Sequence, residues 1–377
     1  MILRIAWRNV MHKKLRALAS IGGVAFSILL VFMQLGIFSA AENSAEVVFQ
    51  QLDFDVALAS PQYVFLASAG TVPREAMLRA RDIPGVASAK PLYIGLARYR
   101  TPDDNLRRGV FTMGIDPANS PFSNPEIQRQ AEGLSQLGTA LADREARGEY
   151  GPRDVGAESD FGSGRIKIIG HYTMGAGFIE GTDMVVSDAT FCRLLEGRRI
   201  DRPTAILVKA ESPAATEKLV ERLRRELGPD VVPYTRREII DVETNYFVNV
   251  KPIGIMFRAG VVVGFLVGAV TLYQILALQV ANHIRELATM KAVGFSDAGV
   301  YGVVVAEGLL YALIGFAPAF LGGVALYRLL RTQANVPVWM TAERAAVVFL
   351  LTLVMCAISC TLALRKVRVA DPADLFG

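Results

Sequence analysis

The sequence has few of the residues on which metal sites and disulfide-held folds depend. It contains three cysteines and three histidines in 377 residues. Cys356 and Cys360 lie inside an apolar run, which leaves Cys192 alone and excludes a disulfide framework elsewhere in the chain. The histidines are too scattered to suggest a metal cluster, at positions His12, His171 and His283. We therefore expect no metal and no cofactor in this chain.

Catalytic motifs are also missing from the sequence. It has no GxSxG, HExxH or CxxC run, and no GxxxxGK[ST] run that would bind ATP through a P-loop. Two pairs of acids, Asp53 with Asp55 and Asp103 with Asp104, fall in expected loops, where such pairs are usually solvated. We predict no catalytic residue.

The chain also lacks a strong net charge, but it contains long apolar runs. Forty Lys and Arg against 36 Asp and Glu give +4, too little to indicate nucleic-acid binding. Hydrophobic residues make up 52% of the chain, and its mean hydropathy is +0.34. Four runs lack any charge: Ala17–Ala41, Ala259–Asn282, Gly308–Tyr327 and Ala345–Leu364. Because a membrane helix needs about 20 apolar residues, each run predicts one transmembrane helix.

The first run has a second interpretation. A basic start followed by an apolar run is also typical of a secretory signal, and Ser39-Ala40-Ala41 resembles a cleavage site. The apolar core of a signal has about 7–15 residues. This run has 25, so we predict an uncleaved span.

The distribution of Lys and Arg predicts the orientation of the spans. Ten lie before the first run, after the second and after the fourth, against three between the third and the fourth. Since cytoplasmic loops are enriched in these residues, we expect both termini in the cytoplasm and the long segment after the first run outside. The expected location is the cell inner membrane, with several passes.

Residues 42–254 have the composition of a globular α+β domain. Helix–stop–strand units occur at both ends: Pro73–Ile83 followed by a strand pair in Val86–Arg100, and Pro213–Leu227 followed by a strand through Val231 and Val232. They predict one end subdomain, 60–100 plus 201–236. An insertion at 101–200 would contain strands at Val110–Gly114, Arg165–His171 and Asp183–Ser187. Residues 143–164 are polar and rich in glycine and predict a loop.

The remaining segments complete the predicted order. Residues 1–16 form an amphipathic cytoplasmic helix. Its basic residues recur every four positions on one side, and its apolar residues lie on another: Arg4, Arg8, His12 and Arg16 against Leu3, Ala6, Trp7 and Val10. This helix lies in the membrane interface and touches a partner, or it only orients the first span. The spans are 17–41, 255–282, 300–327 and 345–364, with a cytoplasmic helix at 283–299, an outer loop at 328–344 and a cytoplasmic tail at 365–377.

Three glycines and one acid are unusual within the spans. Gly260, Gly264 and Gly268 form a tandem GxxxG pattern, which lets two helix backbones approach closely. Such a close contact could form between two subunits, or it could pack the second span against another span of the same chain. We favour the contact between subunits. Glu307 lies inside the third apolar stretch. Acids within a membrane are costly and often functional, although Glu307 could equally lie at headgroup level.

The run HIRELATMKAVGFSDAG, from His283 to Gly299, connects the second and third spans. It predicts a short helix that ends near Gly294, with charges facing outward. A short, capped, charged helix at the end of a span is suited to docking a soluble protein; an ordinary connecting turn is the alternative. The residues expected to make the contact are Arg285, Glu286, Leu287, Thr289, Lys291 and Gly294.

These features resemble the permeases of the MacB/FtsX/LolC class, the type VII ABC transporters. Arg285–Gly294 is similar to the coupling-helix pattern of that class, E-x-A-T-(L/M)-K-A-x-G. Phe32–Gly36, Thr271–Ile275 and Ala370–Phe376 resemble the DevC-type members more closely. The resemblance covers roughly residues 1–42 and 255–377 by motif, and the outer domain by position and size.

The resemblance implies a function in transport. Two copies would form a homodimer through the first and second spans. A separate cytoplasmic ABC ATPase would hydrolyse ATP, and the spans would transmit that motion to the outer domain (mechanotransmission). In exporters of this class the outer domain works with a periplasmic adaptor, a membrane fusion protein, and a TolC-like outer-membrane channel. The substrate stays open among glycolipid, lipid, peptide and drug.

Two other functions compete with this one. FtsX-like members of the class are signalling permeases that regulate a periplasmic cell-wall hydrolase. A membrane enzyme with an outer catalytic domain is disfavoured by the missing catalytic motifs. A neighbouring adaptor gene would favour export, and a neighbouring hydrolase gene would favour regulation.

Overall fold

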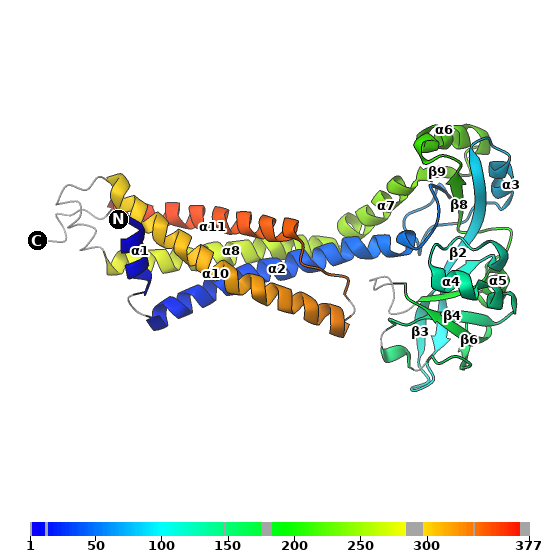
Figure 1. The fold of residues 1–377 in the computed structure, drawn as a ribbon, viewed down its shortest axis with the longest axis horizontal. Helices are drawn as coiled ribbons and strands as arrows, with labels where there is room; N and C mark the ends of the chain where they lie inside the picture. The colour runs from blue at the N-terminus through cyan, green and yellow to red at the C-terminus, as the bar shows by residue number, and fades with distance from the viewer. Residues whose placement is uncertain are drawn as a thin grey trace, which may run out of the picture. The chain divides into compact units, whose positions relative to one another are not determined.

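The computed structural model describes residues 2–11, 14–146, 148–151, 153–174, 183–283, 297–334 and 336–369. The chain forms two compact units. The helical unit comprises Met1–Ser39, Ile255–Gln333 and Val338–Gly377, and the α/β unit comprises Ala40–Gly254 and Ala334–Pro337. Figure 1 follows the chain from α1 to α11 in colour.

Within the described residues, four helices are long and apolar enough to cross a membrane, which confirms the four predicted spans. They are α2 (Lys14–Gln50), α8 (Pro252–Asn282), α10 (Asp297–Ala334) and α11 (Ala342–Val369). All four helices extend past the apolar runs that predicted them. The longest extensions at a C-terminal end are those of α2 and α10, in which no glycine or proline stops the helix. α2 includes Glu42–Gln50, and α10 includes Arg328–Ala334 from the expected outer loop.

The amphipathic start is helix α1 (Ile2–Met11). Its apolar side is divided differently from the sequence prediction. Ala6 and Val10 are buried, whereas Leu3 and Trp7 are 63% and 50% exposed. Residues four apart share a helix face, so the small side chains pack inward together and the two large ones lie on an exposed face. That face suits a membrane interface.

A single mixed sheet forms the centre of the α/β unit. In its described residues nine strands pair in the order β3-β7-β4-β6-β5-β2-β8-β1-β9, and β2 also pairs with β3. Six of the strands therefore close a ring: β2 (Val86–Arg100), β3 (Arg107–Ile115), β7 (Asp183–Ser187), β4 (Thr139–Asp143), β6 (Gly164–Tyr172) and β5 (Glu158–Phe161). The others are β8 (Ala205–Ala210), β1 (Val56–Ala59) and β9 (Val232–Thr235).

Short helices complete the α/β unit. The α-helices are α3 (Glu75–Arg81), α4 (Pro125–Gln130), α5 (Asp188–Leu194), α6 (Thr216–Leu227) and α7 (Arg236–Asn245). Short 3-10 turns lie at Pro117–Asn119, Ala131–Ser135, Gly148–Tyr150 and Pro213–Ala215, and one π-helical turn, η5, at Tyr246–Val250. Helices α3 and α6 pack on β1, β8 and the start of β2 around one apolar cluster, which unites the two ends of the domain as the sequence pattern indicates.

Two local predictions for this unit are wrong. Val86–Arg100 is one long strand rather than a strand pair, because Val86–Leu92 pairs with β8 while Leu92–Arg100 pairs with β3. The expected loop 143–164 contains strand β5, which forms a hairpin with β6. Gly162 makes the tight turn of this hairpin possible, since its φ of 56° is one that other residues rarely adopt. The three strands predicted within 101–200 are confirmed as β3, β6 and β7.

Candidate functional site

The glycine ladder of α8 lies against α2 of the same chain. A Cβ atom at Gly264 would be 3.4 Å from Val31 Cγ2, an ordinary contact. At Gly268 it would be 3.1 Å from Ser27 Cβ and would also overlap a neighbouring methionine sulfur. At Gly260 it would overlap the side-chain amide of a glutamine on α2. The ladder thus permits close packing inside one chain, and a subunit contact through these glycines stays a prediction.

Polar contacts also join the spans. The ring of Tyr327 on α10 fills the space that a Cβ atom at Gly36 on α2 would need, and its hydroxyl donates to the carbonyl oxygen of Phe32. Gln279 Nε2 on α8 donates to the hydroxyl oxygen of Tyr311 on α10 at 2.7 Å. Hydrogen bonds between membrane helices fix which faces meet, because apolar packing alone does not distinguish the helices from lipid.

Glu307, the acid within the third span, is 4% exposed. Its Oε1 accepts a hydrogen bond of 2.8 Å from Asn9 Nδ2 on α1. The carboxyl group therefore ties the amphipathic first helix to α10. This contact gives Glu307 a structural role, and a further functional role for it stays a prediction.

The predicted docking helix falls almost wholly outside the described residues. Helix α8 ends at Asn282, where the amide of His283 donates to Gln279 O at 3.0 Å, and α10 begins at Asp297. The undescribed stretch between these ends contains all six candidate contact residues: Arg285, Glu286, Leu287, Thr289, Lys291 and Gly294. Their docking role stays a prediction.

The polar groups of the α/β unit that sequence analysis considered have ordinary structural partners. Asp104 pairs with Arg108 at 2.7 Å, and Asp53 pairs with Lys209 at 2.9 Å. Burial raises the pKa of the Cys192 thiol to about 11, which disfavours the reactive thiolate. In the part of the chain that the structure describes, no three His, Cys, Asp or Glu side chains gather into a metal-ligand set.

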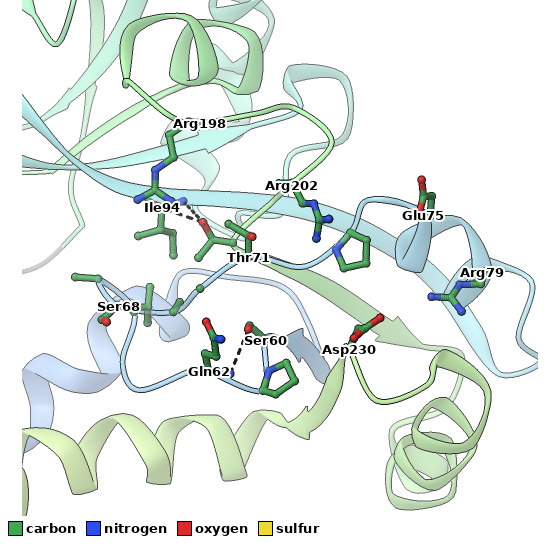
Figure 2. A pocket seen from close by; sticks show the side chains of 17 residues that line it. Ser60, Gln62, Ser68, Thr71, Glu75, Arg79, Ile94, Arg198, Arg202 and Asp230 are labelled. Atoms are coloured by element: carbon green, nitrogen blue, oxygen red, sulfur yellow. Dashed lines mark hydrogen bonds between the residues drawn. The ribbon is translucent and has the colours of Figure 1, made fainter.

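A polar cleft of about 810 Å³ opens in the α/β unit, and sequence analysis did not predict it. One wall is the loop Ser60–Thr71 between β1 and α3, and the other includes Ile94 on β2 and the segment Arg198–Thr204 before β8 (Figure 2). The charged side chains that line it are Glu75, Arg79, Arg198, Arg202 and Asp230. These residues come from three separate segments, so no local pattern in the sequence could have revealed them.

The loop wall of this cleft is held from behind by Glu243 on α7. This residue is fully buried; its carboxylate accepts hydrogen bonds from the Leu66 amide at 3.0 Å and from the Tyr63 hydroxyl at 2.8 Å. Burial raises the pKa of Glu243 to about 7, while the bonds from Leu66 and Tyr63 and the charge of Lys251 lower it in part. Lys251 Nζ itself lies 5.3 Å from the ring centroid of Phe65 in the same loop.

Two family models match the chain. The MacB-like periplasmic core domain matches residues 17–226, and the FtsX-like permease C-terminal domain matches residues 258–372. A search of curated proteins found no match.

Similar solved structures cover about half of this chain. The periplasmic region of MacB from Actinobacillus actinomycetemcomitans is 14% identical, with a TM-score of 0.37, over 52% of this chain and 96% of that one. The extracellular domain of the noncanonic ABC-type transporter YknZ from Gram-positive bacteria is 11% identical, with a TM-score of 0.36, over 48% and 98%. A domain of a putative permease from Porphyromonas gingivalis is 14% identical, with a TM-score of 0.29, over 48% and 90%.

The two matched family models together span most of the chain. They agree with the structure, in which an α/β domain is inserted in the sequence between the first and second of four apolar helices. The chain belongs to the MacB/FtsX-like permeases of the type VII ABC transporters.

Proposed function

We propose that this chain is the mechanotransmission subunit of an ABC exporter, driven by a separate cytoplasmic ATPase. Membership of the family implies association with an ABC ATPase and dimerisation. The observation that carries the proposal is the match at residues 258–372, because it spans both helices that flank the segment 284–296. That segment contains the coupling-helix pattern of the class.

The proposed orientation puts this segment and both termini in the cytoplasm, with the α/β unit in the periplasm. The ten-to-three asymmetry of Lys and Arg supports it. Single cysteines introduced at Ser163 and Ser296, in a background that lacks Cys192, test it with an impermeant thiol reagent. In intact spheroplasts we expect labelling at Ser163, which is exposed on the α/β unit. Labelling only at Ser296 would reverse the orientation.

Chain continuity supplies a route for the motion. Helix α8 runs without interruption from Asn282 to Pro252, and α7 and η5 precede it directly along the chain. Helix α2 is similarly continuous from Lys14 to Gln50 before the chain enters β1. Continuous helices are stiff over such lengths, so displacement at the proposed docking end would reach the residues that enter the α/β unit.

The dimer contact is proposed for an exposed face of α8 that lies beside its row of glycines. Val263, Val267, Val270 and Gln274 are exposed along this face, at spacings that place them on one side of a helix. Gln274 is an amide within a predicted span, and an amide facing lipid is unfavourable unless another protein group covers it. A second copy of the chain would provide that cover.

We further propose a periplasmic adaptor and an outer-membrane channel as partners, as in DevC-type systems. The FtsX-like match supports the regulatory alternative, in which the partner is a cell-wall hydrolase. The test is expression of the chain with the ATPase encoded nearest to its gene, followed by purification through the permease. We expect the ATPase and any adaptor to co-purify; recovery of a hydrolase instead would favour regulation.

A further inference from the structure

The cleft of the α/β unit is lined by more basic than acidic side chains, and these side chains do not form salt bridges with one another. Three arginines face two acids: Arg79, Arg198 and Arg202 against Glu75 and Asp230. Among the described residues, none of the five belongs to a salt bridge. In Figure 2, Arg198 and Arg202 lie on one side of the cleft, and Ser60 and Gln62 lie on the other.

Arg198 is fixed in position by its surroundings. Its guanidinium carbon lies 6.0 Å from the ring centroid of Phe191. A Cβ atom at Gly95 would come within 3.4 Å of Arg198 Nη2, so the glycine leaves room for the guanidinium against β2. Because Arg198 is half-buried and its guanidinium lies between a ring and a strand, less conformational entropy would be lost when it binds an anion than for an exposed arginine.

Both walls of the cleft are fixed by hydrogen bonds. The Tyr93 hydroxyl donates to Ile200 O at 2.5 Å, which holds the segment carrying Arg198 and Arg202 on β2. On the other wall, Glu243 holds the Leu66 amide. A cleft with two anchored walls is formed before any ligand enters, as is usual for small-molecule sites.

We propose that this cleft binds a small oxygen-rich anion, with its acidic group between Arg198 and Arg202. Its volume of about 810 Å³ lies within the range of about 300–1,000 Å³ that is typical of small-molecule sites. The hydroxyl groups of Ser60, Ser68 and Thr71 line the same space and can donate to further oxygens of the ligand. Guanidinium groups match carboxylate and phosphate geometry, so anionic oxygens are the shared chemistry of the ligand.

Calorimetric titration of the full chain in lipid nanodiscs tests the proposal. The probes are citrate and pyrophosphate, which separate carboxylate from phosphate oxygens, with uncharged glycerol as the negative control. The variants are Arg198→Gln and Arg202→Gln. The matched control is Arg193→Gln, which removes the same charge from an exposed position on α5 that does not line the cleft.

We expect at least one anion to bind the parent chain, and each cleft variant to weaken it about tenfold or more, because a charge-assisted hydrogen bond contributes about 1.5–3 kcal/mol. The control should retain parental affinity, and glycerol should not bind. Failure of both anions to bind the parent at millimolar concentration would overturn the proposal. So would an equal loss of affinity in the Arg193→Gln control.

Discussion

Asn9 on α1 donates a hydrogen bond of 2.8 Å to the carboxyl group of Glu307 on α10, although the two residues are 298 positions apart in the chain. The contact joins the amphipathic first helix to the helix that begins where the undescribed segment 284–296 ends. Both ends of this hydrogen bond therefore lie close in sequence to segments proposed to face the ATPase.

Replacing Asn9 tests this contact. Asn9→Ala removes the donor, and we expect α1 to open more often from the helical unit. Hydrogen bonds between membrane helices contribute about 0.6 kcal/mol on average, so amide exchange in residues 2–11 should rise about threefold. Exchange would be measured by mass spectrometry in nanodiscs. Glu307→Gln keeps an acceptor oxygen and serves as the control; an increase in the control alone would contradict the assigned contact.

The glycine ladder permits a matched comparison within one helix. A Cβ atom fits beside Gly264 but overlaps α11 and crowds α2 at Gly268. We expect Gly264→Ala to leave the melting temperature of the detergent-solubilised protein within a degree or two, and Gly268→Ala to lower it by several degrees, since overpacking costs about 1–3 kcal/mol. Gly22→Ala is the control for the effect of adding a methyl group to a helical glycine, because nothing lies within 4 Å of a Cβ atom at Gly22. Equal melting temperatures for the Gly264 and Gly268 variants would contradict the packing described here.

The buried carboxyl group of Glu243 predicts a pH-dependent loop. Its pKa is raised from 4.5 to about 7, so the folded state holds the proton more tightly than the unfolded state. The contribution of Glu243 to the free energy of unfolding is therefore largest below about pH 4.5. It falls by about 3 kcal/mol in total as the pH rises through 7. Glu243→Gln cannot ionise and should remove this dependence.

Exchange of the Leu66 amide, which donates to Glu243, is the measurement. At pH 5 the parent and the Gln variant should exchange at similar rates. At pH 8 the parent should exchange faster than the variant by about tenfold or more. Comparison at equal pH cancels the intrinsic pH dependence of exchange. A constant ratio between the two proteins from pH 5 to 8 would show that Glu243 does not titrate in this range.

The proposed dimer face predicts a specific cross-link. In a background in which Cys192, Cys356 and Cys360 are replaced, Gln274→Cys should form a disulfide-linked dimer on mild oxidation in membranes. Leu321→Cys on α10 is the control, because Leu321 is also exposed but lies on a different helix from the proposed dimer face. A dimer band from Leu321→Cys without one from Gln274→Cys would move the interface to α10.

Much of this architecture could be predicted from the sequence, since long apolar runs and charge asymmetry are local signals. The same holds for strands such as Arg165–His171, whose alternating pattern records one buried face. Glu243 could not be found in this way. It looks like any exposed helical acid until the fold places Leu66 and Tyr63 beside it. The cleft could not be predicted for the same reason, because Arg198 and Ser60 are far apart in the sequence and line one cleft only after the sheet has formed.

The sequence could not predict which helix the glycines of α8 face. A GxxxG pattern states that a helix packs closely against something, but it does not say against which helix. The structure shows that α2 of the same chain occupies that side of Gly264. The exposed Gln274 then becomes the more informative residue for the dimer, although its exposure is visible only after α8 has been packed.

The central claim is that an ATPase acts on the segment between α8 and α10, and Glu286→Lys tests it most directly. The sequence predicts that Glu286 faces outward, and a charge reversal at an exposed position usually changes stability by about 0.5 kcal/mol or less, so the permease should still insert and dimerise. Gly294→Val should differ, because the sequence predicts a helix that ends near Gly294, and a β-branched residue would strain an end of the positive-φ type. The expected result there is a bound ATPase whose hydrolysis is uncoupled from export.

The decisive measurement is the molar ratio of ATPase to permease after co-purification, read beside ATPase activity in nanodiscs. The control is Glu343→Lys, the same charge reversal on an exposed residue at the start of α11. We predict that Glu286→Lys lowers the ratio to well under half of the parental value while Glu343→Lys retains it. If Glu286→Lys keeps the ATPase at the parental ratio and both Glu286→Lys and Gly294→Val export normally, the segment is only a connector and the account of an ATP-driven permease is contradicted.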